Sequence, residues 1–384
     1  MSKTIYEINE KIKAGKAVVV TAEEVIEIAE QQGYKKAAET VDVVTTGTFG
    51  PMCSSGMFIN FGHSEPPIRM AKVTLNDVPA YAGLAAVDAY IGATEQSLSK
   101  GNEYGGAHVI EDMIAGKDIY LHAESPGTDC YPRKSIDTMI NKDNVNQVYL
   151  FNPRNAYQNY PAATNSTNKT IYTYMGTLLP NYGNITYSTA GQLSPLLNDP
   201  EYRTIGPGTR IFFGGNIGYV AWEGTQHNPE RERLDNKIPV LGAGTLALIG
   251  DVRGMNTQFI RAGVFQKYGI TLYVGVGIPI PIIDEDILAK TAVKDEEIYT
   301  RIVDKSGKEN LDFLVNYKQL RSGQIDFKGK KVNTAPLTSL VKSRTIAKTL
   351  KEWIIKGDFT LTEKIIDLPM HTKVNKLEVR GIQE

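Results

Sequence analysis

The sequence predicts an α/β protein with mixed sheets, Gly-rich loops at strand ends and a smaller α+β C-terminal part. Helical and strand patterns alternate over the first 46 residues. Several apolar runs pass directly into turns that contain glycine and proline, as in the stretch 41–56. Residues 1–283 hold 30 of the 35 glycines, whereas residues 284–384 carry 19 Lys and Arg against 16 Asp and Glu. We therefore expect a region at 1–283 that holds both cysteines. Residues 284–384 then form a second domain or pack as one unit with it.

The order of the elements follows from hydrophobic spacing and from helix-capping residues. Near the N-terminus, Thr21 with Glu24 forms a capping-box pattern that begins a helix. A separate helical pattern spans residues 338–356, and Gly357 directly after it is a typical helix stop. Apolar runs or alternation predict strands at 16–20, 41–46, 73–78, 119–124, 148–151, 270–278 and 359–365.

Composition excludes several classes of protein. The formal net charge of the 384-residue chain is -1, which gives no reason to expect a nucleic-acid partner. No stretch approaches the ~20 apolar residues of a membrane span. The first residues also lack the apolar core of a signal peptide. Two cysteines in such a chain are typical of a reducing compartment, so we expect a cytoplasmic protein that binds no membrane.

The cysteine count also limits the metals. Two thiols cannot supply the four ligands of an iron–sulfur cluster or of a Cys-rich zinc site. A mixed site using His63, His108, His122 or His227 stays open, but no histidine pair has a ligand-like spacing. We expect no metal and no cofactor bound by this chain.

The stretch 127–134 is the first candidate for chemistry. Cys130 follows Asp129, and Arg133 and Lys134 come three and four residues after it. A cation near a thiol stabilises the thiolate, which is the nucleophile. The alternative is a buried structural cysteine that behaves as a small hydrophobe.

Cys53 is the second candidate. It lies in a loop with three glycines and a proline, directly after an apolar run. Accessible backbone N–H groups in such a loop can bind an anion, although a tight structural turn would have the same pattern. Because both cysteine loops follow predicted strands, we expect the two loops to meet in one pocket. A disulfide between Cys53 and Cys130 stays open.

Three further residues are candidates for binding. His122 lies on the strand that leads to Cys130, so it is either a proton donor or a strand-face residue. Arg154 and Asn155 follow the strand 148–151 in an aromatic-rich loop, where arginine suits a carboxylate as a planar fork. The alternative for Arg154 and Asn155 is an ordinary turn without a binding role.

Three segments of this chain together resemble the homocysteine biosynthesis family, and the resemblance covers nearly the whole chain. They are GPMCSSG at 50–56, GTDCYPRK at 127–134 and NPRNAYQNY at 152–160. The resemblance implies an L-aspartate semialdehyde sulfurtransferase of methanogens and other anaerobes, which forms homocysteine for methionine biosynthesis. It implies that Cys130 carries a persulfide and that Cys53 is a secondary catalytic candidate. Many relatives carry a pair of CBS modules, and we expect a form without them.

The resemblance also implies partners. The substrates would be L-aspartate semialdehyde and a sulfur donor, with electrons from an external ferredoxin-like iron–sulfur protein. The substrate-binding candidates are then Asp129, Arg133, Lys134, Arg154, Asn155 and His122. A homodimer stays open. Two other readings also stay open, namely a thiol-redox or metal-handling protein that uses Cys53 and Cys130, and a non-catalytic binding protein.

Overall fold

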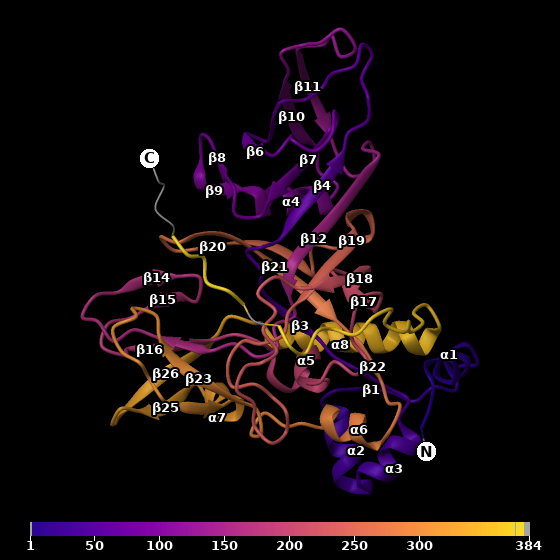
Figure 1. Ribbon diagram of the computed structural model, residues 1–384, viewed down its shortest axis with the longest axis vertical. Coiled ribbons are helices and arrows are strands. Elements are labelled where there is room, and N and C mark those ends of the chain that lie inside the picture. The colour runs from indigo at the N-terminus through magenta and orange to yellow at the C-terminus, as the bar shows by residue number, and fades with distance from the viewer. Residues whose placement is uncertain (1, 373, 380–384) are drawn as a thin grey trace.

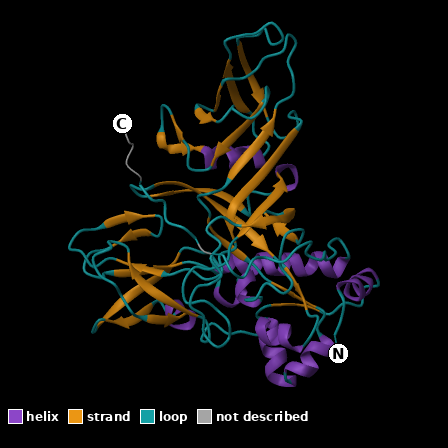
Figure 2. Ribbon diagram, in the orientation of Figure 1, coloured by secondary structure: helices purple, strands orange, loops and turns teal. Residues whose placement is uncertain are grey.

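A computed structural model describes residues 2–372 and 374–379 of the chain. An antiparallel sheet runs through the middle of the molecule, with a second sheet above it and a third at the lower left (Figure 1). Most helices gather at the lower right, whereas strands make up the rest (Figure 2). This mixture of helices and several sheets confirms the predicted α/β class.

The central sheet is antiparallel throughout and has nine strands. Strand β21 is buried on both faces because helix α8 covers one face and helix α4 covers the other. The side chains of Ile346 and Leu350 occupy the space beside Gly275 and Gly277, so these positions have no room for a side chain. In order across the sheet, the strands are β20 (Ile260–Phe265), β21 (Gly269–Gly277), β17 (Arg210–Phe213), β18 (Asn216–Glu223), β19 (Leu246–Asp251), β12 (Gln147–Asn155), β4 (Gly56–Asn60) and β7 (Asp88–Gly92), with β3 (Thr48–Pro51) beside β21.

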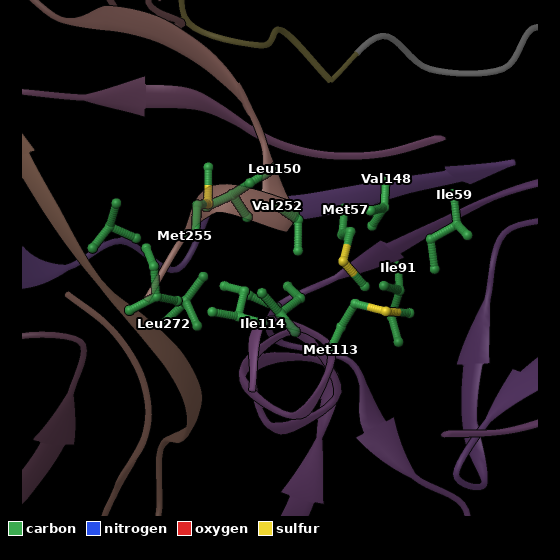
Figure 3. Packing of buried hydrophobic residues seen from close by; sticks show 14 of the residues in the cluster. Met57, Ile59, Ile91, Met113, Ile114, Val148, Leu150, Val252, Met255 and Leu272 are labelled. Carbon is green, nitrogen blue, oxygen red and sulfur yellow. The ribbon is translucent and has the colours of Figure 1, made fainter. Parts of the chain in front are cut away.

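The largest hydrophobic core lies between this sheet and helix α4. Figure 3 shows Met113 and Ile114 of the helix against Met57, Ile91 and Leu272 of the strands. All five side chains are at most 2% exposed, which makes this cluster a main source of folding free energy.

A four-stranded antiparallel sheet extends from the far end of β4 and carries the Cys130 loop. Its strands are β11 (Ser135–Ile140), β10 (Ile119–Glu124), β5 (Lys72–Leu75) and β6 (Val78–Ala80). We expected one strand over 73–78, but Asn76 and Asp77 have φ of 48° and 67° and divide it into a hairpin. A positive φ at both central residues is what the tight hairpin turn requires, and Asn and Asp tolerate it.

A six-stranded sheet combines strands from both sides of residue 284. Its strands are β24 (Leu314–Asn316), β23 (Tyr299–Asp304), β13 (Ala162–Thr164), β16 (Asn184–Tyr187), β26 (Lys330–Pro336) and β25 (Gln324–Phe327). The pairs β13–β23 and β16–β26 are parallel and join the two parts of the chain. That residues 284–384 form a domain of their own stays a prediction.

Three smaller sheets contain the remaining strands of the described residues. They are β1 (Val19–Thr21), β2 (Val43–Thr45) and β22 (Pro279–Pro281); β14 (Ile171–Thr173) and β15 (Gly176–Leu178); and β8 (Gln96–Ser97) and β9 (Gly101–Gly105). The helices are α1 (Ile5–Lys13), α2 (Glu24–Gln32), α3 (Tyr34–Thr40), α4 (Gly106–Ile114), α5 (Pro195–Asn198), α6 (Glu285–Thr291), α7 (Tyr317–Arg321) and α8 (Leu340–Lys356). Within residues 2–372 and 374–379, no helix is long and apolar enough to cross a membrane.

The two predictions for the C-terminal region had different outcomes. The helix expected over 338–356 is confirmed as α8, which ends at Gly357 with φ of 79°. The strand expected over 359–365 is wrong. Phe359 and Leu361 are buried as the alternation suggested, but the backbone of Leu361 bonds to the side chain of Asn9 instead of another strand.

We predict that Leu350→Ala destabilises the protein by about 2–5 kcal/mol, because its fully buried side chain packs between α8 and the central sheet. The measurement is the free energy of unfolding from denaturant titration. Lys348→Ala, at an exposed position of the same helix, is the matched control and should change it by less than about 0.5 kcal/mol. Equal effects of the two variants would contradict the packing described.

Candidate active site

A pocket opens where the turn between β3 and β4 meets the end of β12 and the β14–β15 hairpin. It offers about 260 Å³ of space, which fits a small metabolite. Its lining combines one thiol, one guanidinium and four phenols. The lining residues are Pro51, Met52, Cys53, Ser54, Arg154, Tyr157, Tyr160, Tyr174, Met175, Ser188, Phe265, Tyr268, Thr271 and Leu337.

Cys53 is exposed and lies in the turn that joins β3 to β4. The Ser55 backbone N–H and hydroxyl both donate to the Met52 carbonyl, at 3.1 and 2.8 Å, which closes the turn. The strand after it must begin with Gly56, since a Cβ there would lie 2.0 Å from the Tyr90 hydroxyl oxygen. These hydrogen bonds close the turn, and it presents the thiol at the pocket.

The neighbouring strand β12 holds this turn through the buried amide of Asn152. Asn152 Nδ2 donates to Ser55 Oγ at 2.7 Å, and its Oδ1 accepts from Ser54 Oγ at 3.3 Å. The same Oδ1 accepts from the Arg154 backbone N–H at 3.0 Å. One side chain thus fixes the positions of both the thiol turn and the arginine.

Arg154 lies where the pairing register of β12 shifts between Asn152 and Asn155. Its Nε donates to Thr225 Oγ1 at 3.1 Å. Within the described residues it makes no ion pair with a carboxylate. A guanidinium that no carboxylate neutralises is suited to bind the carboxylate of a ligand in the pocket.

The tyrosines form an aromatic wall. The ring centroids of Tyr157 and Tyr160 are 5.0 Å apart, and those of Tyr174 and Tyr268 are 6.3 Å apart. Burial raises the pKa of Tyr157 to about 12 and also raises the pKa of Tyr160 and of Tyr268. Burial would also raise the pKa of Tyr174, but hydrogen bonds from Lys305 and Tyr160 lower it below its usual value.

Asn155, the other candidate on β12, has a different place. Its side chain is fully buried, and its Oδ1 accepts from the Ala156 backbone N–H at 2.6 Å. Its Nδ2 is buried without a hydrogen-bond partner among the described residues. Asn155 is next to the pocket in sequence but does not belong to its lining.

Cys130 is exposed at the tip of the loop between β10 and β11. Thr128 and Tyr131 exchange backbone hydrogen bonds of 2.9 and 3.1 Å, which makes a tight turn around it. The Arg133 side chain donates to the carbonyls of Glu65 and Pro66 at 2.6 and 2.9 Å and so anchors the loop. Asp129 and Lys134 are exposed in the same loop.

His122 lies on the solvent-facing side of β10, away from the Cys53 pocket. Its Nδ1 is 2.7 Å from Asp137 Oδ1, and its Nε2 is 3.6 Å from Glu124 Oε1. The hydrogen bond to Asp137 raises the pKa of His122. Among residues 2–372 and 374–379, no group of three or more His, Cys, Asp or Glu could hold a metal ion.

The two cysteine loops do not meet in one pocket, contrary to our expectation. Figure 1 shows the β10–β11 loop at the top of the molecule, whereas β3 and the start of β4 lie near its centre. Both loops follow strands, but the strands belong to different sheets, and β4 carries the chain away from Cys53. The pocket brings Cys53 and Arg154 together. Asp129, Arg133, Lys134 and His122 lie with Cys130 on the four-stranded sheet and its loop.

The lining also contains residues that we did not predict, chiefly the four tyrosines. Tyr157 and Tyr160 follow Arg154 closely, so the run of aromatic residues was a usable signal. Tyr174 and Tyr268 come from distant hairpins, and no local pattern marks them.

A small pocket lined by a thiol, a guanidinium and four phenols is typical of a protein that binds a small molecule. Comparison with known proteins then gives the family. The model of the family described as "Homocysteine biosynthesis enzyme, sulfur-incorporation" matches residues 17–361. This chain belongs to that family.

Two relatives named L-aspartate semialdehyde sulfurtransferase are each 54% identical to this chain. That of Methanosarcina acetivorans is matched over 94% of this chain and 70% of its own length. That of Methanocaldococcus jannaschii is matched over 94% of this chain and 72% of its own length. An uncharacterized protein of Methanothermobacter thermautotrophicus is 27% identical over 85% of this chain and 73% of its own length. No solved structure is significantly similar.

We predict that no single chain forms a Cys53–Cys130 disulfide. The bond requires Cα atoms about 4.4–6.8 Å apart, whereas the two loops lie on different sheets. The measurement is peptide mapping of the single-chain band after oxidation and non-reducing electrophoresis, with Cys130→Ala as the control. A Cys53–Cys130 peptide within the single-chain band would contradict the separation described.

Proposed function

We propose that this protein is an L-aspartate semialdehyde sulfurtransferase that forms homocysteine. The observation that carries the proposal is a thiol and an unneutralised arginine in one small pocket, Cys53 and Arg154. The 54% identity to two proteins of that name supports the choice of substrate.

L-Aspartate semialdehyde matches the chemistry of the pocket. Its carboxylate would pair with the Arg154 guanidinium through two parallel hydrogen bonds. Its ammonium group would lie against the faces of the tyrosine rings, which attract cations. The aldehyde carbon would then lie towards Cys53.

The sulfur would arrive as a persulfide on Cys130. This thiol is exposed at the tip of a loop, where a donor protein can reach it. Lys134 is exposed in the same loop, where its charge is available to an anionic sulfur donor. Arg133 has a positioning role, because its side chain is used to anchor the loop.

The transfer can be written with every atom accounted for. The terminal sulfur of the Cys130 persulfide adds to the aldehyde carbon, and the carbonyl oxygen takes a proton. The Cys53 thiolate then attacks the Cys130 sulfur and breaks the S–S bond. A hemithioacetal thiolate leaves, and a Cys53–Cys130 disulfide remains.

The product requires electrons from outside the chain. Loss of water from the hemithioacetal gives a thioaldehyde, which needs two electrons and two protons to become the thiol of homocysteine. The disulfide needs two more electrons and two protons to restore both cysteines. A ferredoxin-like iron–sulfur protein is the class of reductant that we propose for both steps.

The transfer joins two thiols that one chain holds apart. We therefore propose that Cys130 of one copy reaches the Cys53 pocket of a second copy, so that the working unit is a homodimer. The exposed position of the Cys130 loop at one end of the molecule suits such an exchange (Figure 1).

Mixing two single-cysteine variants tests this function. We predict that Cys130→Ala forms no homocysteine and that Cys53→Ala loses roughly tenfold or more, because each removes one thiol of the transfer. An equal mixture should regain about a quarter of the wild-type rate, since half of the dimers are mixed and each of these has one intact site. The assay measures homocysteine under anaerobic conditions, with the aldehyde, a sulfur donor and an excess of reductant.

The controls separate the parts of the proposal. Mixing either variant with the Cys53→Ala/Cys130→Ala double variant supplies no complementary thiol and should give no gain. A wild-type rate in Cys130→Ala would refute the persulfide on Cys130. Inactive variants whose mixture stays inactive would place the transfer within one chain. No homocysteine from the wild type would favour a thiol-redox or metal-handling protein.

A further inference from the structure

Tyr174 and Lys305 form a close pair at the wall of the Cys53 pocket. Tyr174 lies in the turn between β14 and β15, and Lys305 directly follows β23. Lys305 Nζ donates to Tyr174 Oη at 2.5 Å and lies 4.6 Å from the centroid of its ring. Lys305 makes no ion pair with a carboxylate in the described part of the chain. Its charge therefore acts on this phenol.

Tyr174 differs from the other tyrosines of the pocket in its proton affinity. Burial raises the pKa of Tyr157, Tyr160 and Tyr268. At Tyr174 burial opposes ionisation as well, but the hydrogen bonds from Lys305 and Tyr160 outweigh it and the pKa is lowered. A phenol whose pKa is brought closer to neutral can give up a proton and recover it within a catalytic cycle.

We propose that Tyr174 is a catalytic proton donor to the carbonyl oxygen of the aldehyde bound beside Cys53, with Lys305 as the positioning residue that stabilises its phenolate. This step rests on the proposed function. As sulfur adds to the aldehyde carbon, the carbonyl π pair moves to oxygen and takes the proton of the Tyr174 hydroxyl. The phenolate left beside the Lys305 ammonium then takes a proton from water, so no electrons are transferred.

The surroundings of Tyr174 determine the sign of the pH dependence. The titratable groups that face it are Tyr160 between β12 and β13, Tyr268 between β20 and β21, Lys305, and Cys53. No carboxylate belongs to the pocket lining. Because only the protonated phenol donates, the rate should fall as pH rises through the pKa of Tyr174. Removing the Lys305 charge should move that fall to higher pH.

Three variants test the assignment. Tyr174→Phe should lower kcat by about 10²–10⁴-fold with little change in KM, since it removes only the donated proton. Lys305→Met should lower kcat less and shift the alkaline limb of the pH–rate profile to higher pH. Tyr172→Phe is the matched control, because Tyr172 also has a lysine over its ring, Lys267 at 5.0 Å, but does not line the pocket. Its kcat and its profile should match those of the wild type.

Ultraviolet titration of tyrosinate gives a readout that does not depend on turnover. The wild type should show one tyrosine that ionises before the others, which Tyr174→Phe removes and Lys305→Met shifts to higher pH. An active wild type with kcat of Tyr174→Phe within about twofold would overturn this assignment and leave the proposed function standing. A Lys305→Met profile identical to that of the wild type would also overturn it. A wild type that forms no homocysteine would refute the proposed function itself.

Discussion

The buried amide of Asn152 is the contact on which the pocket depends. Its Nδ2 holds Ser55 in the thiol turn, while its Oδ1 accepts from Ser54 and from the Arg154 backbone. A buried amide that satisfies groups on two elements fixes both, since each lost bond would leave an unpaired polar atom costing about 1–3 kcal/mol. The turn that carries the thiol and the backbone of Arg154 are therefore held together before any ligand arrives. Such preorganisation suits a pocket that must hold a small ligand beside a thiol.

The second constraint is the separation of the two thiols. Cys53 lies in a turn of the central sheet, and Cys130 lies at the tip of a loop that Arg133 anchors to the segment 65–67. Both thiols are exposed, but only Cys53 lines a pocket. A thiol at the tip of a loop suits the receipt of sulfur from another protein, and a thiol in a pocket suits a reaction with a small aldehyde. The two positions thus divide the proposed reaction into loading and transfer. In the structure Asp129, Lys134 and His122 lie with the Cys130 loop and its sheet, and Arg154 lies with the Cys53 pocket.

Local patterns predicted the elements of the fold better than their assembly. Gly357 marked the end of α8, and the loop position of Cys53 was readable because a turn is encoded by nearby residues. The loop expected at Arg154 and Asn155 is wrong, because β12 continues through both residues with a shift in its pairing register. The parallel pairing of β13 with β23 was not readable, since it joins segments about 140 residues apart. The same nonlocal pairing brings Lys305 to Tyr174, so neither residue could be found in advance. The alternation over 359–365 correctly predicted which side chains are buried, but it does not correspond to a strand. The single side chain of Asn9 bonds to the backbone N–H and carbonyl of Leu361 in place of a neighbouring strand.

The central claim is that the pocket of Cys53 and Arg154 binds the amino-acid substrate. The most direct measurement is the rate of alkylation of each cysteine, followed by mass spectrometry, with and without L-homoserine, which has the same carboxylate and ammonium but no aldehyde. The account predicts that L-homoserine slows alkylation of Cys53 and leaves that of Cys130 unchanged. It further predicts that Arg154→Ala abolishes this protection. Protection of Cys130 alone, or equal protection of both thiols, would contradict the account.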